Sequence, residues 1–235
     1  RPLRGPLSAH LASTFEEFRH TFAQWPVLPL NVIYADTSGT IGWQLVGEAP
    51  SRRKGWGTLP VSGADPDAGW DGTVPFDQMP HVVDPPPGYV ATANNQPTRA
   101  GDGPFLGVDW ADGYRLARIL ECLGGRADWD VPGFMALQMD ECSIPWREMR
   151  SAVLEAQVGT DAGGKALALL EEWDGRVGAG SPAATVFELF TAELGHGVHY
   201  GPRPPGIQRA AGAEPFAGPA YRTSSSRTAG CTDFF

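Results

Sequence analysis

The 235-residue chain has few basic residues, few cysteines and no long apolar run. Its 18 lysines and arginines face 27 aspartates and glutamates, so the net charge is −9. This balance argues against a nucleic-acid coat or a polybasic membrane binder. Three scattered cysteines are too few for a disulfide framework or a zinc ribbon. No apolar run approaches the roughly 20 residues of a membrane-spanning helix, and we expect neither a nucleic-acid nor a membrane partner.

The sequence also lacks the short motifs that mark common enzyme classes. It has no GxSxG elbow, no HExxH, no Walker A loop, no GxGxxG loop and no CxxC pair. His196 and His199 are three residues apart, as metal ligands on one helix face would be. Two histidines are fewer ligands than a metal site needs. The alternative interpretation of this segment is a helix that ends after Gly195. We predict that the chain binds no cofactor.

Glycine and proline are abundant instead, with 30 and 22 residues. Loops and turns are therefore expected to form a large share of the chain. Residues 1–200 are predicted to form one domain. Residues 201–235 are rich in Gly, Pro, Ala, Ser and Arg without periodicity, which predicts a disordered tail.

The first 46 residues predict a helix followed by a β-hairpin. Ser13 and Glu16 have the spacing of a capping box, and aromatic residues follow at helical intervals, which favours a helix over about residues 13–24. Two apolar runs, residues 30–34 and 41–46, flank an Asp-Thr-Ser-Gly turn and predict the hairpin.

Residues 47–88 read as a long connection without regular structure. Connections of this length in a compact domain are usually functional or held in place by large side chains. Trp56, Trp70 and Phe76 are the anchors that we expect. Residues 89–93 are predicted to form a further short strand.

From residue 110 onwards the pattern is helical. Four stripes of apolar residues at i, i+3, i+4 and i+7 spacing predict four helices. Ser143 is the expected N-cap of the second helix, and the last helix is predicted to open at Ser181 and to end at Gly195. The fold class is therefore α+β, with a β-hairpin and loops followed by a helical region.

An ordered series of segments is more informative than any single pattern. The series contains NVIYADTSGTIGW (31–43), PSRR (50–53), LPVSG (59–63), WDGTVPF (70–76), PPGYVATANN (86–95), DWADGYRLARI (109–119), ALQMD (136–140) and LEEWDG (170–175). In this order and at these spacings it resembles the β-subunit of the penicillin acylase (penicillin amidase) family. The resemblance covers about residues 13–195. Each segment alone is a weak signal, whereas the series is specific.

The resemblance implies an N-terminal nucleophile hydrolase. In that family a precursor cuts itself and exposes a serine, whose hydroxyl attacks an amide carbonyl with its own α-amine as general base. An α-amine has a pKa of about 8, close to working pH, so it suits this role. The implied fold is a four-layer αββα core, of which this chain would form part.

The resemblance assigns two site residues to this chain. The family places an oxyanion-stabilising asparagine at the first Asn of the "ANN" segment, which is Asn94 here, and an active-site arginine in the "YR" motif, which is Arg115. An amide NH₂ donates to an oxyanion without titrating, and a guanidinium stays charged beside it. The alternatives are that Asn94 only bonds a strand end and that Arg115 only covers its helix.

The nucleophile of the family has no counterpart in the chain. Position 1 is arginine, and Ser8 has no free amine. We therefore expect the serine, the α-subunit and the remaining β-subunit segments to lie outside this chain, which alone would be inactive. The expected function is cleavage of a linear amide, the acyl side chain of a β-lactam or an acyl-homoserine lactone. The alternative is a degenerate, non-catalytic family member that acts as a binding or interaction module.

The resemblance also bears on metal and compartment. Some family members hold a structural Ca²⁺, and Asp102 lies near that region, but one carboxylate does not make a calcium site. Family members are commonly exported, which implies a periplasmic or extracellular location.

Overall fold

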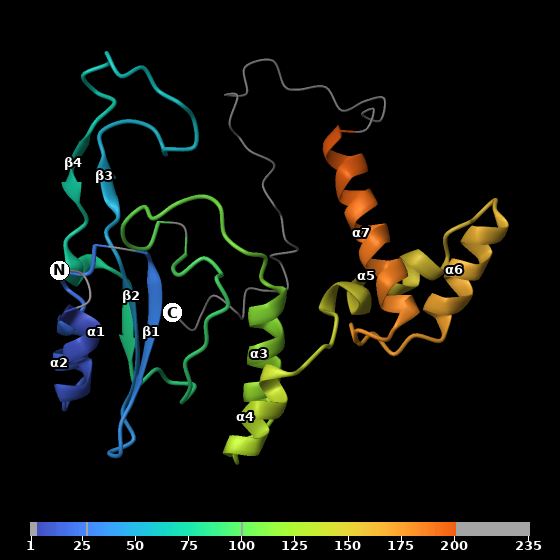
Figure 1. Ribbon diagram of the computed structural model, residues 1–235, viewed down its shortest axis with the longest axis horizontal. Coiled ribbons are helices and arrows are strands. Elements are labelled where there is room, and N and C mark those ends of the chain that lie inside the picture. Colours follow the sequence, from blue (N-terminus) through green and yellow to red (C-terminus); the bar gives the residue numbers. More distant parts are fainter. Residues whose placement is uncertain (1–3, 27, 100, 201–235) are drawn as a thin grey trace. The chain divides into compact units, whose positions relative to one another are not determined.

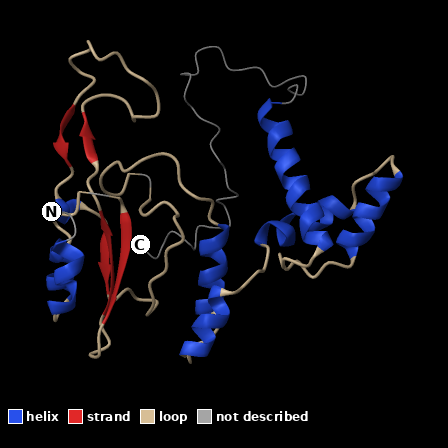
Figure 2. Cartoon of the chain, viewed as in Figure 1, coloured by secondary structure: helices blue, strands red, loops and turns tan. Residues whose placement is uncertain are grey.

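The computed structural model describes residues 4–26, 28–99 and 101–200. These residues form two compact units, the first ending at Ala127 and the second starting at Asp128. Within them, the strands lie in the first unit and the second is helical, as Figure 2 shows. The predicted α+β class is confirmed. The tail predicted for residues 201–235 lies outside the described residues.

The hairpin forms where the sequence predicts it. Strand β1 (Leu30–Ala35) pairs antiparallel with β2 (Ile41–Val46), and β5 (His81–Val83) pairs with the other edge of β2. The sheet order is therefore β1-β2-β5 (Figure 1). The register places Tyr34 opposite Gly42. β2 is the central strand and is almost entirely buried.

Asp36 organises the hairpin turn. Its Oδ1 accepts hydrogen bonds from the N–H and Oγ of Ser38 (2.8 and 2.6 Å) and from the N–H of Thr40 (3.1 Å), and its Oδ2 accepts one from the Tyr34 hydroxyl (2.9 Å). The Ser38 and Tyr34 hydroxyls hold the pKa of the Asp36 carboxyl below its usual value. Burial, reinforced by Asp36, raises the pKa of Tyr34. The turn is thus specified by one carboxylate.

The N-terminal helices precede the sheet. α1 spans Arg4–Ser8, the 3-10 helix η1 spans Ala9–Leu11, and α2 spans Phe15–Thr21. The predicted start at Ser13 was one residue early, because Thr14 accepts the hydrogen bond from the Glu17 N–H (3.1 Å). Ser13 instead donates its N–H to the Glu17 carboxylate (2.8 Å), so the capping interactions are shifted by one position.

Aromatic rings join α2 to the hairpin. The Phe15 and Phe18 rings lie 5.8 and 5.3 Å from the Tyr34 ring. Gly42 on β2 leaves room for the Phe15 ring, because a Cβ added at Gly42 would overlap that ring. Figure 1 shows α2 running alongside β2.

The predicted connection at 47–88 contains more structure than its composition indicates. β3 (Pro50–Arg52) pairs with β4 (Trp70–Thr73), and a 3-10 turn, η2 (Phe76–Gln78), leads into β5. Trp70 was wrongly predicted as an anchor, since it is 62% exposed, and Trp56 is 63% exposed with its ring 5.6 Å from that of Phe105. Phe76 is half-buried and lies under the Arg19 guanidinium. The connection is anchored by Met79, which is buried in a cluster with Trp43, Leu45 and Ala49. Four partly buried residues pack against this cluster: Val74, Val82, Val90 and Leu106.

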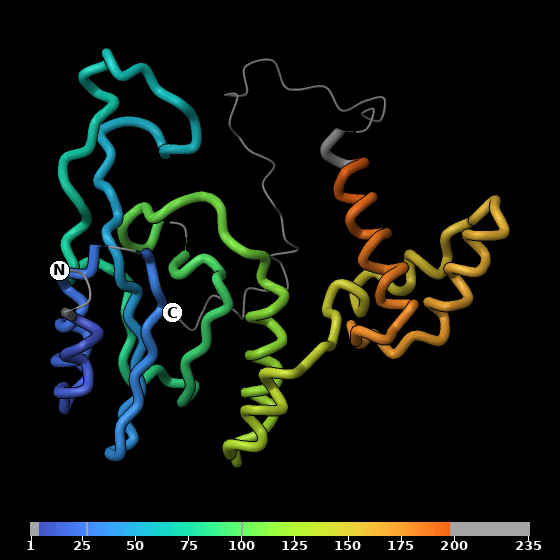
Figure 3. The backbone as a smooth tube through the Cα atoms, in the orientation of Figure 1, coloured from blue at the N-terminus to red at the C-terminus, as the bar shows by residue number. Residues whose placement is uncertain are grey.

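An irregular segment leads from β5 to α3 (Tyr114–Gly124), and Figure 3 traces its course. The strand predicted at 89–93 does not form, because no neighbouring strand is paired with these residues. Ala91 and Ala93 are nevertheless buried, so the segment is fixed by packing. α3 matches its predicted stripe and buries Leu116, Leu120 and Leu123.

The second unit contains α4 (Val131–Gln138), α5 (Ile144–Leu154), α6 (Asp161–Glu171) and α7 (Pro182–Tyr200). Three of these were predicted, and Ser143 caps α5 by accepting from the Trp146 N–H (3.2 Å). α4 was not predicted, because it has no buried residue and therefore no amphipathic stripe. The core of the unit is formed by Trp146, Val153, Leu170, Trp173, Ala183, Ala184 and Phe187.

α7 does not end at Gly195 as predicted. It continues through Gly195 and Gly197, since a glycine inside a helix costs only about 1 kcal/mol relative to alanine and does not terminate it by itself. No helix among the described residues combines the length and the apolar character needed to cross a membrane.

Candidate functional site

Asn94 lies in the irregular segment between β5 and α3. Its side chain is exposed, and its backbone is left-handed, with φ of +60°. Asp84 is the only other described non-glycine residue with positive φ. Asparagine tolerates this conformation better than most residues, but such backbones are concentrated at functional sites. The carbonyl of Asn94 accepts a hydrogen bond from the Ala111 N–H (3.0 Å), which joins the segment to the approach of α3.

Arg115 is the second residue of α3. The helix begins where the Asp112 carboxylate accepts a hydrogen bond from the Tyr114 N–H (3.1 Å). Leu116, the next residue, is buried and fixes the face that the helix turns to the core. Arg115 itself remains exposed. This placement leaves its guanidinium available for a contact outside the core.

The structure brings the two predicted residues together. Arg115 Nη2 donates a hydrogen bond to Asn94 Oδ1 at 3.1 Å, across 21 positions of sequence. A guanidinium has only donors, so the amide atom that faces it must be the oxygen. The contact therefore sets the orientation of the Asn94 amide. Its Nδ2 takes part in no hydrogen bond among the described residues, and both N–H donors are available to an acceptor from outside.

Asn95 is a part of this site that the sequence analysis did not single out. Its Oδ1 accepts a hydrogen bond from the Ala93 N–H (3.1 Å), and its Nδ2 donates to the Gln96 carbonyl (2.9 Å). Its side chain thus reaches back across Asn94. The only sequence signal for it was a second asparagine in the "ANN" segment.

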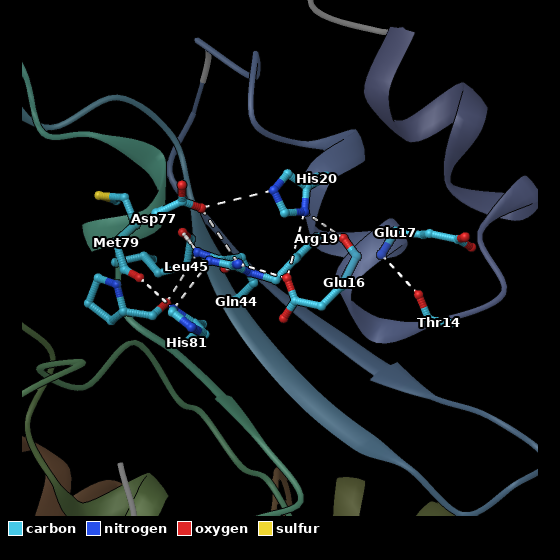
Figure 4. Close-up of polar contacts among 11 residues, drawn as sticks. Thr14, Glu16, Glu17, Arg19, His20, Gln44, Leu45, Asp77, Met79 and His81 are labelled. Carbon is cyan, nitrogen blue, oxygen red and sulfur yellow. Dashed lines mark hydrogen bonds and ion pairs between the residues drawn. The ribbon is translucent and has the colours of Figure 1, made fainter.

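A second polar cluster, drawn in Figure 4, surrounds Arg19 on α2. Arg19 Nε donates to Gln44 Oε1 (2.8 Å), and its Nη1 donates to Glu16 Oε2 (3.0 Å). Its guanidinium carbon lies 5.1 Å from the centre of the Phe76 ring, and its Nη2 lies 3.4 Å from His81 Nδ1. Arg19 and Gln44 are both buried. Because the guanidinium is buried and its Nε and Nη1 both donate to neighbouring side chains, this cluster ties α2 to the sheet rather than forming a ligand site.

Two residues of the basic run Arg52-Arg53-Lys54 are engaged within the β3–β4 region. Arg53 Nε lies 2.6 Å from Asp71 Oδ1, and Lys54 Nζ lies 3.0 Å from Asp65 Oδ2. The Asp67 N–H and the Lys54 ammonium hold the pKa of the Asp65 carboxyl below its usual value. These basic residues stabilise their own loop.

The described residues contain no group of three or more His, Cys, Asp or Glu side chains that could hold a metal ion. His196 lies within α7, so the helix end that we considered for His196 and His199 is wrong. Asp102 lies in an exposed turn between Asn94 and α3. The residues present therefore do not by themselves fit a calcium ion.

Comparisons with known proteins agree with the order of the segments. A family model described as penicillin amidase matches residues 1–226. The penicillin acylase 2 proenzyme of Pseudomonas sp. (strain SE83) is 34% identical over 186 residues, which are 78% of this chain and 24% of that protein. The acyl-homoserine lactone acylase QuiP of Pseudomonas fluorescens is 33% identical over 180 residues, which are 71% of this chain and 22% of that protein.

A solved structure shows the same fold. The thermostable penicillin G acylase from Alcaligenes faecalis matches with a TM-score of 0.66 and 23% identity, over 87% of this chain and 38% of that chain. The chain spans about a quarter of the length of the curated relatives that it matches. Because the family model covers nearly the whole chain and the fold agrees, the chain belongs to the penicillin amidase family.

Proposed function

We propose that the chain forms part of an amidohydrolase that cleaves a linear amide through an acyl-enzyme, with Asn94 as the oxyanion donor and Arg115 as the residue that orients it. The observation that carries the proposal is the Arg115–Asn94 hydrogen bond. It holds the amide oxygen of an exposed asparagine and leaves the NH₂ group available. Preorganised hydrogen-bond donors of this kind form oxyanion holes.

The roles follow from the chemistry of amide cleavage. A serine hydroxyl outside this chain attacks the amide carbonyl, and its proton passes to the α-amine of the same residue. The carbonyl oxygen gains negative charge as the tetrahedral intermediate forms. Asn94 Nδ2 donates a hydrogen bond to that oxygen, and the positive charge of Arg115 stabilises the same region. The oxygen becomes a carbonyl again when the α-amine passes its proton to the leaving amine and the C–N bond breaks. Water then attacks the serine ester and releases the acid.

The substrate class comes from the relatives. Their names describe acylases of penicillin and of acyl-homoserine lactone. We propose the acyl side chain of a β-lactam or an acyl-homoserine lactone as the substrate. The α-subunit and the remaining β-subunit segments are the proposed partners, since the chain spans about a quarter of these relatives. We propose that the mechanism uses no cofactor and that the protein acts in the periplasm or outside the cell.

The test uses the protein expressed from its whole reading frame, with benzylpenicillin and an acyl-homoserine lactone as substrates. Asn94→Ala should lower kcat by roughly 10²–10³, because one oxyanion donor is lost. Asn31→Ala is the matched control, because it removes an asparagine side chain outside the segment that contains Asn94. The Asn31 oxygen accepts a hydrogen bond from Trp43 Nε1 (2.8 Å). A wild-type kcat in Asn94→Ala would refute the role. If the whole wild-type protein binds these amides without cleaving them, the non-catalytic alternative holds.

A further inference from the structure

The side chain of Asn95 forms a short bridge over Asn94. Oδ1 of Asn95 accepts the hydrogen bond from the N–H of Ala93, so the bridge closes a small ring that contains the whole backbone of Asn94. Nδ2 of Asn95 donates to the Gln96 carbonyl, which fixes the orientation of the Asn95 amide. The residue enclosed by this ring is the one with φ of +60°.

We propose that Asn95 is a positioning residue, which holds Asn94 in its left-handed conformation and so directs the Asn94 NH₂ group toward the oxyanion. The inference rests on the proposed function of Asn94. Left-handed backbone costs free energy even for asparagine, which tolerates it better than most residues, so contacts with the surroundings are needed to hold it as the single conformation. The bridge supplies that enforcement at the residue itself.

The neighbouring contacts make the bridge effective. Ala93 and Ala91 are buried on one side, and Pro97 is buried on the other, so both flanks are anchored. Asn95 is itself half-buried, which limits the competition of water for its amide. Between these flanks, the Asn95 bridge restrains the backbone of Asn94 from the chain's own neighbouring residues, in addition to the hydrogen bond from the distant Ala111 N–H.

Two further contacts depend on the conformation that the bridge maintains. The Asn94 carbonyl receives the Ala111 N–H, and Asn94 Oδ1 receives Arg115 Nη2. A change in φ at Asn94 would turn its Cα–Cβ bond and separate Oδ1 from the guanidinium. Loss of the bridge is therefore expected to disorder the donor while leaving the rest of the segment in place.

The experiment measures kcat and KM in the protein expressed from its whole reading frame, with rates divided by the number of active sites counted by titration. Asn95→Ala should lower kcat by roughly tenfold, since small displacements of a catalytic group are costly, and should change KM by less than about twofold. Gln96→Ala is the matched control: its exposed side chain is shortened, whereas the carbonyl that receives Asn95 is kept. If Asn95→Ala yields no folded protein, Asn95→Ser, whose oxygen is one bond shorter, should show the same loss.

A double-mutant cycle separates positioning from a general structural role. In an Asn94→Ala background, Asn95→Ala should cause no further loss of kcat, because there is no donor left to position. An equal loss in both backgrounds, or a wild-type kcat in Asn95→Ala, would overturn the inference while leaving the role of Asn94 intact. A wild-type kcat in Asn94→Ala alone would overturn both.

Discussion

Arg115 and Asn94 contact each other on the surface, where a hydrogen bond adds little to stability. Exposed contacts of charged groups typically contribute less than about 1 kcal/mol, so this pair is better explained by what it orients than by what it stabilises. The same reasoning separates it from the Arg19–Gln44 contact, in which both partners are buried and which joins a helix to the sheet.

Arg115→Lys should lower kcat in the whole protein by roughly tenfold, because an ammonium cannot reproduce the planar, fixed donors of a guanidinium. Arg115→Ala should lower it at least as much. Thermal midpoints should stay near that of the wild type, since the side chain is exposed. Steady-state kinetics with titrated active sites would check this, and an Arg115→Ala variant with the wild-type kcat would argue that the guanidinium merely covers its helix.

Asp36 gives the chain a defined pH dependence. Its pKa is lower in the folded chain than in the unfolded chain, so the folded state is stabilised above the unfolded value of about 4. That stabilisation should be lost as the pH falls through the lower, folded pKa. In Asp36→Asn, thermal midpoints measured from pH 6 to pH 2 should fall less steeply than in the wild type. Equal slopes would show that the turn carboxylate does not contribute.

At the scale of elements, the packing of α2 on β2 depends on the missing side chain of Gly42. Gly42→Ala should destabilise the first unit by about 1–3 kcal/mol, because the new Cβ would overlap the Phe15 ring. Gly63→Ala is the control, since no atom lies within 4 Å of the added Cβ there. Denaturant unfolding followed by tryptophan fluorescence measures the difference. Identical midpoints for the two variants would contradict this packing.

The elements that were predictable are those with a clear apolar signal in the sequence. Helices α3, α5 and α6 have periodic apolar residues that pack into a core, and the β1–β2 hairpin has two apolar runs on either side of a turn. β3, β4 and β5 are three or four residues long, too short to show a period, and α4 has no buried face. The prediction that Trp56 and Trp70 are buried anchors failed because large apolar side chains are not confined to protein cores.

The candidate site was predictable only in part. The resemblance pointed to Asn94 and Arg115, and the structure shows them in contact. Neither the left-handed backbone of Asn94 nor the bridge from Asn95 could be derived from sequence, because both depend on how residues 89–113 fold back on themselves. Without the resemblance, an asparagine at a predicted strand end would have carried no functional meaning.

At the scale of the whole molecule, we predict that this chain alone does not cleave amides. The proposed oxyanion donor and arginine lie on the chain, whereas the proposed nucleophile and its α-amine lie outside it. The measurement is release of amine from benzylpenicillin and from an acyl-homoserine lactone by the purified chain. The protein from the whole reading frame, at equal concentration, is the positive control. Turnover by the chain alone, abolished by Asn94→Ala, would mean that the nucleophile lies within it.

The most direct measurement is a crystal structure of the whole protein with a boronic acid bound to its nucleophile as a tetrahedral adduct. We expect Asn94 Nδ2 to lie about 2.7–3.1 Å from the adduct oxygen that stands for the oxyanion, with Arg115 still bonded to Asn94 Oδ1. An adduct oxygen more than about 4 Å from Asn94 Nδ2 would lie beyond hydrogen-bonding distance and would contradict the central claim.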